Sequence, residues 1–182
     1  MGKKYDSITD DHRSFIEAQK IYFCATAAAE GRVNLSPKGS DTLRVVSPTK
    51  VIWLNLTGSG NETAAHLLDD PRMTLMFCAY EGSPKILRLY GSATAVYPQD
   101  ERWEKLYENF ESRIGARQIY ELDVDLVQTS CGFGIPYYDY AGDRDKLREW
   151  ESNHGENGIE EYWHTHNATS LDARPTRTER NN

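Results

Sequence analysis

Short apolar segments follow one another along most of this chain with only turns or short helices between them, and this succession limits the fold more than any other feature. The segments are rich in β-branched and aromatic residues, and they span 20–28, 33–39, 43–47, 50–56, 72–80, 85–97 and 117–130. Because no long helix separates consecutive strands, a doubly wound parallel sheet is disfavoured. The pattern favours a mainly β fold of the α+β class, in which about six or seven strands form a small antiparallel barrel with helices packed outside.

Helices are predicted where apolar residues recur every three or four positions. These segments are 10–18, 61–69, 99–110, 143–152 and 156–165. In the first helix Phe15 and Ile16 are expected to face inward. In the second, the inward residues are expected to be Ala64, Leu67 and Leu68.

The character of the chain changes after residue 130, where the loop "CGFGIPYYDY" is rich in glycine and aromatic residues. We therefore expect a barrel domain at 1–141 and C-terminal helices at 142–173 that pack on the same domain. The stretch "ARPTRTERNN" lacks periodicity, which predicts a disordered tail at 174–182.

The composition excludes several classes of protein. With 28 acidic and 21 basic residues the formal net charge is −7, which argues against a nucleic-acid binder and against docking on anionic membranes. Cys24, Cys78 and Cys131 form no CxxC motif, so neither a zinc site nor a disulfide framework is indicated, and Cys24 and Cys78 are expected to be buried thiols. The first residues lack the apolar stretch of a signal peptide, and no apolar run reaches membrane-spanning length. We expect a cytoplasmic protein.

The stretch "LTGSGNETAAH" at 56–66 permits two interpretations. Its glycines and polar residues precede a short helix, an arrangement that presents backbone amides to a phosphate. Alternatively, Ser59 and Glu62 form a capping box, which would occupy the same amides. The stretch contains no lysine or arginine, so a phosphate site would need a cation from elsewhere, and Lys38 and Arg88 are the candidates.

Three quoted stretches in this order resemble the pyridoxamine 5′-phosphate oxidase-like, FMN-binding split-barrel family. They read "FCATAAAEGRVNLSPKG", "VIWLNLTGSGNETAAHLLDDPRMTLMF" and "LRLYGSATAV", and the resemblance covers about residues 12–130. The later segments "QTSCGFGIP" and "NATSLD" are similar to those of an uncharacterised subgroup. The resemblance implies a six-stranded antiparallel split barrel and a homodimer that binds one FMN per subunit at its interface.

The resemblance also implies which residues contact FMN. The family commonly places an Arg-Lys pair at the phosphate turn, where this chain has Glu62 and Thr63. Lys38 would lie near the pyrimidine edge of the flavin ring and would stabilise the reduced flavin. The cofactor-binding residues carried over in this way are Ser36, Lys38, Leu56, Thr57, Gly60, Asn61, Glu62, Thr63 and Arg88.

The activity implied is that of an FMN-dependent oxidoreductase, which transfers hydride or electrons through flavin N5 and acts on a small-molecule substrate. No catalytic acid or base is assigned. Oxidation of pyridoxamine phosphate itself is not expected, because "EYWHTHNATSLDARP" does not match the Arg-x-His segment of those enzymes. The alternatives are a non-catalytic flavin- or haem-binding protein on the same dimeric fold, or a dimer whose site has decayed. His164 and His166 do not share a helical face, so no metal site is predicted.

Overall fold

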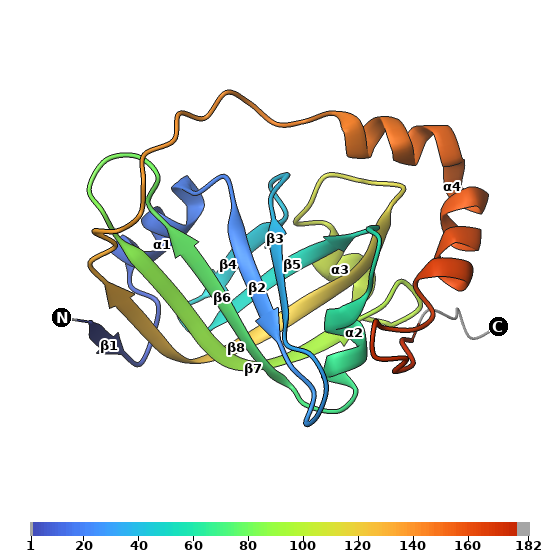
Figure 1. Ribbon diagram of the computed structural model, residues 1–182, viewed down its shortest axis with the longest axis horizontal. Coiled ribbons are helices and arrows are strands. Elements are labelled where there is room, and N and C mark those ends of the chain that lie inside the picture. Colours follow the sequence, from blue (N-terminus) through green and yellow to red (C-terminus); the bar gives the residue numbers. More distant parts are fainter. Residues whose placement is uncertain (1, 178–182) are drawn as a thin grey trace.

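Eight strands of the computed structural model, which describes residues 2–177, form one antiparallel sheet (Figure 1). The strands are β1 (Lys3–Tyr5), β2 (Tyr22–Thr26), β3 (Asn34–Lys38), β4 (Leu43–Ser47), β5 (Lys50–Leu56), β6 (Arg72–Cys78), β7 (Ile86–Val96) and β8 (Ala116–Ser130). Their order is β3-β2-β6-β7-β8-β5-β4, and β1 pairs with β8. The antiparallel fold with peripheral helices is confirmed, although the sheet has eight strands where the resemblance implies six. β1 was not predicted.

The sheet bends sharply but does not close on itself. β7 and β8 carry a register shift between Tyr90 and Gly91, where the long strands curve. A Cβ atom at Gly91 would lie 1.9 Å from the carbonyl oxygen of Asp123, so this close approach requires glycine. The two ends of the described sheet, β3 and β4, remain unpaired with each other, which leaves the barrel split.

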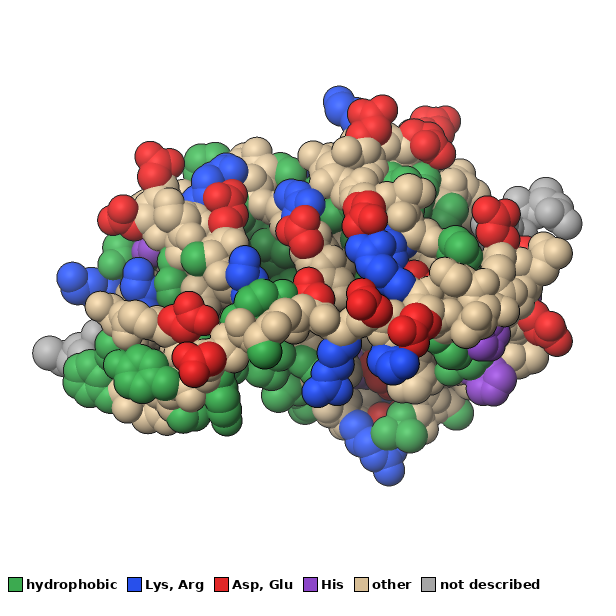
Figure 2. Space-filling model, turned by 90° about the horizontal axis from the view of Figure 1, so that it is seen from above, with side chains coloured by type: hydrophobic (Ala, Val, Ile, Leu, Met, Phe, Trp, Pro, Cys, Tyr) green, Lys and Arg blue, Asp and Glu red, His purple; other side chains and the backbone are tan. Residues whose placement is uncertain are grey.

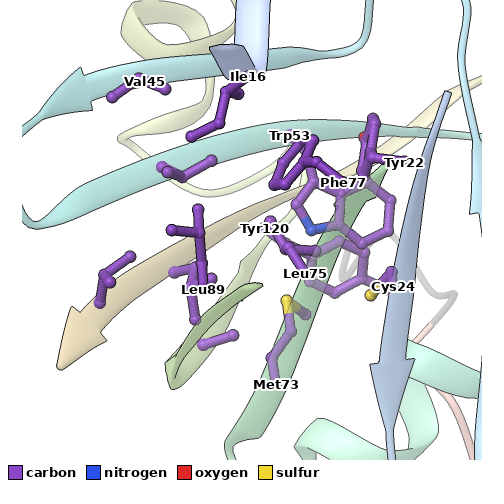
Figure 3. Close-up of a cluster of buried hydrophobic side chains, with 14 of the residues drawn as sticks. Ile16, Tyr22, Cys24, Val45, Trp53, Met73, Leu75, Phe77, Leu89 and Tyr120 are labelled. Carbon is purple, nitrogen blue, oxygen red and sulfur yellow. The ribbon is translucent and has the colours of Figure 1, made fainter. Parts of the chain in front are cut away.

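The concave side of the sheet encloses an aromatic core (Figure 3). The rings of Trp53 and Tyr120 lie 4.5 Å apart between centroids, and those of Tyr22 and Phe77 lie 5.7 Å apart. Cys24 is fully buried beside them, as expected. Burial of this apolar surface is the main stabilising contribution to the fold.

The helices lie around the sheet at α1 (Asp10–Ala18), α2 (Glu62–Leu67), α3 (Trp103–Tyr107) and α4 (Lys146–His166). Ile16 of α1 is buried against the core as predicted. Leu68 is 59% exposed, so its predicted inward orientation is wrong, because α2 ends at Leu67 and the chain turns away. α4 contains a kink at Gly155, with φ 63° and ψ 178°, which separates two helical parts much as the sequence predicts.

α4 lies at one end of the sheet, and residues 131–145 reach it by crossing the top of the molecule in Figure 1. The Trp163 indole donates a hydrogen bond of 2.7 Å to Thr57 Oγ1, and Arg113 pairs with the buried Glu151 at 2.8 Å. Arg174, inside the predicted tail, contacts Asp69 at 3.3 Å. The last part of that predicted tail, 178–182, lies outside the described residues.

The side of the molecule crossed by residues 131–145 carries acidic and basic side chains intermingled (Figure 2). Tyr138 packs on Tyr80 with ring centroids 5.5 Å apart, and Lys20 lies over the Tyr140 ring at 5.7 Å. Within residues 2–177, none of the helices combines the length and the apolar composition needed to cross a bilayer.

Candidate functional site

A cavity of about 250 Å³ opens where the barrel is split, between β3, the end of β5 and the start of α2. Most of the residues predicted to contact a cofactor line it. The lining residues are Asn34, Ser36, Lys38, Asn55, Leu56, Gly58, Ser59, Gly60, Asn61, Glu62, Thr63 and Arg117. The exceptions among the predicted residues are Thr57 and Arg88.

Strand alternation explains why β3 contributes three side chains to the cavity. Asn34, Ser36 and Lys38 lie two residues apart, so they share one face of the strand. In the β2–β3 pairing Ser36 is opposite Cys24, which is buried in the core, and Lys38 is opposite Tyr22. The side of β3 that faces the barrel interior is therefore also the wall of the cavity.

Arg117, at the start of β8, is the central charged group of the site and was not predicted. The residue is 4% exposed, and its guanidinium donates to Gly60 O at 3.1 Å, to Gln118 Oε1 at 3.2 Å and to Asn167 Oδ1. Each of these acceptors is neutral. Among the described residues no carboxylate pairs with Arg117, so its charge is buried without a counter-ion. Burial lowers the pKa of Arg117 to about 10, which leaves the guanidinium protonated at neutral pH.

Lys38 supplies a second cation to the same cavity. Its Nζ lies 5.1 Å from the centroid of the Trp53 ring, a cation–π contact. Burial lowers the pKa of Lys38, the thiol of Cys24 raises it, and the charge of Arg117 lowers it further. The Lys38 ammonium group makes no hydrogen bond or ion pair in the part of the chain that the structure describes.

The acidic residue of the turn points away from these cations. Glu62 Oε1 accepts a hydrogen bond of 2.9 Å from the backbone amide of Leu171. The capping-box interpretation of Ser59 and Glu62 is wrong, because α2 begins at Glu62 and its N-cap residue is Asn61. The carboxylate therefore fixes the C-terminal segment, and it does not occupy the amides of the turn.

Asn61 presents polar atoms that have no partner among the described residues. It is 2% exposed, and both Oδ1 and Nδ2 are buried without a hydrogen bond. A buried amide that makes no hydrogen bond is unfavourable by about 1–3 kcal/mol per unsatisfied group. Because Asn61 lines the cavity, a ligand there can satisfy it.

The two remaining predicted residues lie outside the cavity wall. Thr57 is buried, and its hydroxyl donates to Gly115 O at 2.9 Å and accepts from Trp163. It anchors α4 to the end of β5. Arg88 lies near the start of β7, opposite Met76, and donates to Ser130 Oγ at 3.4 Å. Within the single chain the structure does not bring Arg88 to the cavity.

Three larger cavities are less suited to an anion. In the cavity of about 360 Å³, the guanidinium of Arg113 is already paired with Glu151. Two others are larger still. One, of about 460 Å³, contains Arg72, but that guanidinium is already paired with Asp70. The other, of about 660 Å³, has Lys20 together with the acidic Glu81 and Asp139 along its wall. Residues 2–177 contain no group of three or more His, Cys, Asp or Glu side chains placed to hold a metal ion.

The smaller cavity can therefore bind an anion. It combines two cations, an unsatisfied amide and the hydroxyls of Ser36 and Thr63, and the carboxylate of Glu62 is turned away. Sequence reasoning located the turn and Lys38 but missed Arg117 and Asn167. One feature of the sequence could have indicated Arg117. It is an arginine at the start of a strand whose other buried positions are largely apolar.

Comparisons with known proteins agree with this architecture. A family model described as pyridoxamine 5′-phosphate oxidase matches residues 8–131. The chain is 35% identical over 191 residues to the pyridoxamine 5′-phosphate oxidase family protein ustO of Aspergillus flavus, covering 94% of this chain and 76% of that protein.

Two solved structures share the fold. HupZ from Group A Streptococcus superposes with a TM-score of 0.52 at 19% identity, covering 65% of this chain and 91% of that one. A candidate pyridoxamine 5′-phosphate oxidase of Lactobacillus delbrueckii superposes with a TM-score of 0.54 at 15% identity, covering 68% of this chain and 94% of that one.

Proposed function

The chain belongs to the pyridoxamine 5′-phosphate oxidase family, and on that premise we propose that it is a cytoplasmic FMN-dependent oxidoreductase whose split-barrel cavity holds the phosphate of FMN. The observation that carries this proposal is the buried Arg117, which among the described residues has neutral partners only, beside Lys38 in one cavity. A buried charge is normally paired. The phosphate of FMN, with a charge close to −2, would be the missing counter-ion.

The residues of the cavity fit such a group. A guanidinium has five N–H groups, and within residues 2–177 the side chain of Arg117 donates hydrogen bonds to Gly60, Gln118 and Asn167 only. N–H groups of Arg117 therefore remain for a ligand. The side-chain amide of Asn61, which has no partner among the described residues, adds a donor, and Lys38 adds an ammonium group. Together they replace the Arg-Lys pair that is common in the family at the positions of Glu62 and Thr63.

FMN, when bound, would supply hydride or electron transfer through N5 of its ring. The chain's own part is to bind and orient. Arg117 and Asn61 would hold the phosphate, while Lys38 would contribute positive charge close to the ligand and stabilise a negative charge that develops there. No side chain of the cavity is assigned as a catalytic acid or base.

We propose that the active form is a homodimer with the cofactor at the subunit interface. The cavity of about 250 Å³ is smaller than the roughly 300–1,000 Å³ that is usual for ligand pockets. A second copy would cover the part of FMN that extends beyond it. On this proposal residues 1–141 form the flavin-binding domain, and the helices within 142–173 pack on it through Trp163 and Glu151.

The spectrum of the purified protein tests the proposal. We expect a flavin absorption band, FMN release on denaturation, and reduction by NAD(P)H followed by reoxidation by an added acceptor. Flavin binding without reduction would indicate a binding protein, and a Soret band would indicate haem. Correctly folded protein that takes up no added FMN would overturn the proposal.

A further inference from the structure

Asn167, the first residue after α4, is fully buried next to the cavity. Both ends of its carboxamide are used. Oδ1 accepts from Arg117 Nη1, and Nδ2 donates to Gly58 O at 3.1 Å. Arg117 Nη2 in turn donates to Gly60 O at 3.1 Å. These contacts close a ring of hydrogen bonds that joins the guanidinium, the turn at 58–60 and the C-terminal segment.

The segment that carries Asn167 is fixed independently of Arg117. Thr169 forms a bridge with Pro175, and Thr176 Oγ1 donates to Asn167 O. Further along, Arg32 pairs with Asp172, which attaches the segment to the turn between β2 and β3. The position of Asn167 is therefore set by its own segment, so its amide oxygen can determine the direction of the Arg117 side chain.

The chemistry of this residue matters as much as its position. An aspartate has nearly the same shape and would accept the same hydrogen bond from Arg117, but it would neutralise the guanidinium and could not donate to Gly58 O. The hydrogen bond to asparagine is already charge-assisted by the guanidinium, but only a carboxylate would also cancel the charge of Arg117. An asparagine holds the guanidinium in place and leaves its charge for a ligand.

We propose that Asn167 is a positioning residue that aims Arg117 into the cavity and, because it is neutral, makes the site selective for flavin that carries a phosphate over flavin that lacks one. The inference rests on the proposed function, since it takes the phosphate of FMN as the anion. It predicts that the selectivity for phosphate depends on the charge of residue 167, whereas binding of the flavin ring does not.

Titration of FMN and riboflavin by flavin fluorescence tests this, with wild type and Asn167→Asp compared. Wild type is expected to prefer FMN, and Asn167→Asp to reduce this preference about tenfold or more, because a charge-assisted hydrogen bond to phosphate is lost. The affinity for riboflavin should change less than about threefold, since riboflavin makes no charge-assisted bond with Arg117. Asn153→Asp, on the exposed part of α4, is the matched control and should retain the wild-type preference.

Asn167→Ala separates charge from structure. It removes both hydrogen bonds of the carboxamide but leaves Arg117 charged, so it should reduce the preference for FMN less than Asn167→Asp does. A greater loss with alanine than with aspartate would overturn the inference, as would an unchanged preference in Asn167→Asp. If either variant does not fold, the other still tests the preference against wild type. Equal binding of FMN and riboflavin by wild type would refute the placement of the FMN phosphate in this cavity, and with it the premise of the inference.

Discussion

At the scale of single residues, the site depends on Arg117, a cation whose burial is unfavourable for its charged form. Arg117 lies among neutral acceptors, and Lys38 is the other cation of the cavity wall. Two like charges in one cavity disfavour each other, and the charge of Arg117 accordingly lowers the pKa of Lys38. A bound dianion would reverse this effect on both groups.

Lys38→Ala and Asn61→Ala should each weaken FMN binding. The first removes a charge and the second removes buried amide groups that a ligand can satisfy, so a loss of about tenfold is expected for each. Isothermal titration calorimetry measures the affinities, and circular dichroism verifies the fold. Glu62→Gln is the control, because its carboxylate points to Leu171 and a glutamine oxygen can accept the same bond. Wild-type affinity in both alanine variants would place the phosphate elsewhere.

The affinity for FMN should depend on pH in two steps. It should rise as pH passes the second phosphate ionisation near pH 6, because both cations are protonated there and the ligand gains a charge. It should fall at alkaline pH below 10.5, since the pKa of Lys38 lies below that ordinary value and the neutral amine no longer attracts phosphate. Fluorescence titrations across this range would measure both steps. In Lys38→Met the alkaline fall should come from Arg117 alone, whose pKa is about 10.

At the scale of elements, the strands follow from local pattern. The predicted segments 43–47 and 50–56 coincide with β4 and β5, because alternation and a tight turn are properties of neighbouring residues. The capping box failed because Glu62 is satisfied by Leu171, which is distant in sequence. The pairing of Arg117 with Asn167 spans fifty residues, and no local pattern indicates it.

Gly91→Ala tests the bend between β7 and β8. The added methyl group would lie 1.9 Å from a backbone oxygen that cannot move without breaking the strand pairing. We expect a loss of about 1–3 kcal/mol or more in the free energy of unfolding, measured by urea denaturation. Gly134→Ala has open space around its Cβ and should leave stability near that of wild type. Equal stability of the two variants would contradict the packing described at the bend.

At the scale of the whole molecule, the sheet is open, and the candidate site lies at one of its edges. β3 and β4 end the described sheet without meeting, and the cavity lies beside β3. The family resemblance gave the fold and the region of the site from sequence. It did not identify the buried Arg117, which lies on β8, whereas the Arg-Lys pair of the family corresponds to Glu62 and Thr63 at the start of α2.

If FMN binds at an interface between two copies, its affinity should depend on protein concentration. Sedimentation equilibrium should give a dimer of the 20.8 kDa chain with one FMN per subunit. Dilution into the range where the dimer dissociates should release FMN, because each protomer then offers only its own part of the site. A monomer that holds FMN with unchanged affinity would contradict the interfacial site.

The ring of contacts around residues 58–60 also has a consequence for biosynthesis. Translation proceeds from the N-terminus, so every strand of the described sheet leaves the ribosome before Asn167 does. While the chain is being synthesised, Arg117 therefore lacks this partner until Asn167 has emerged.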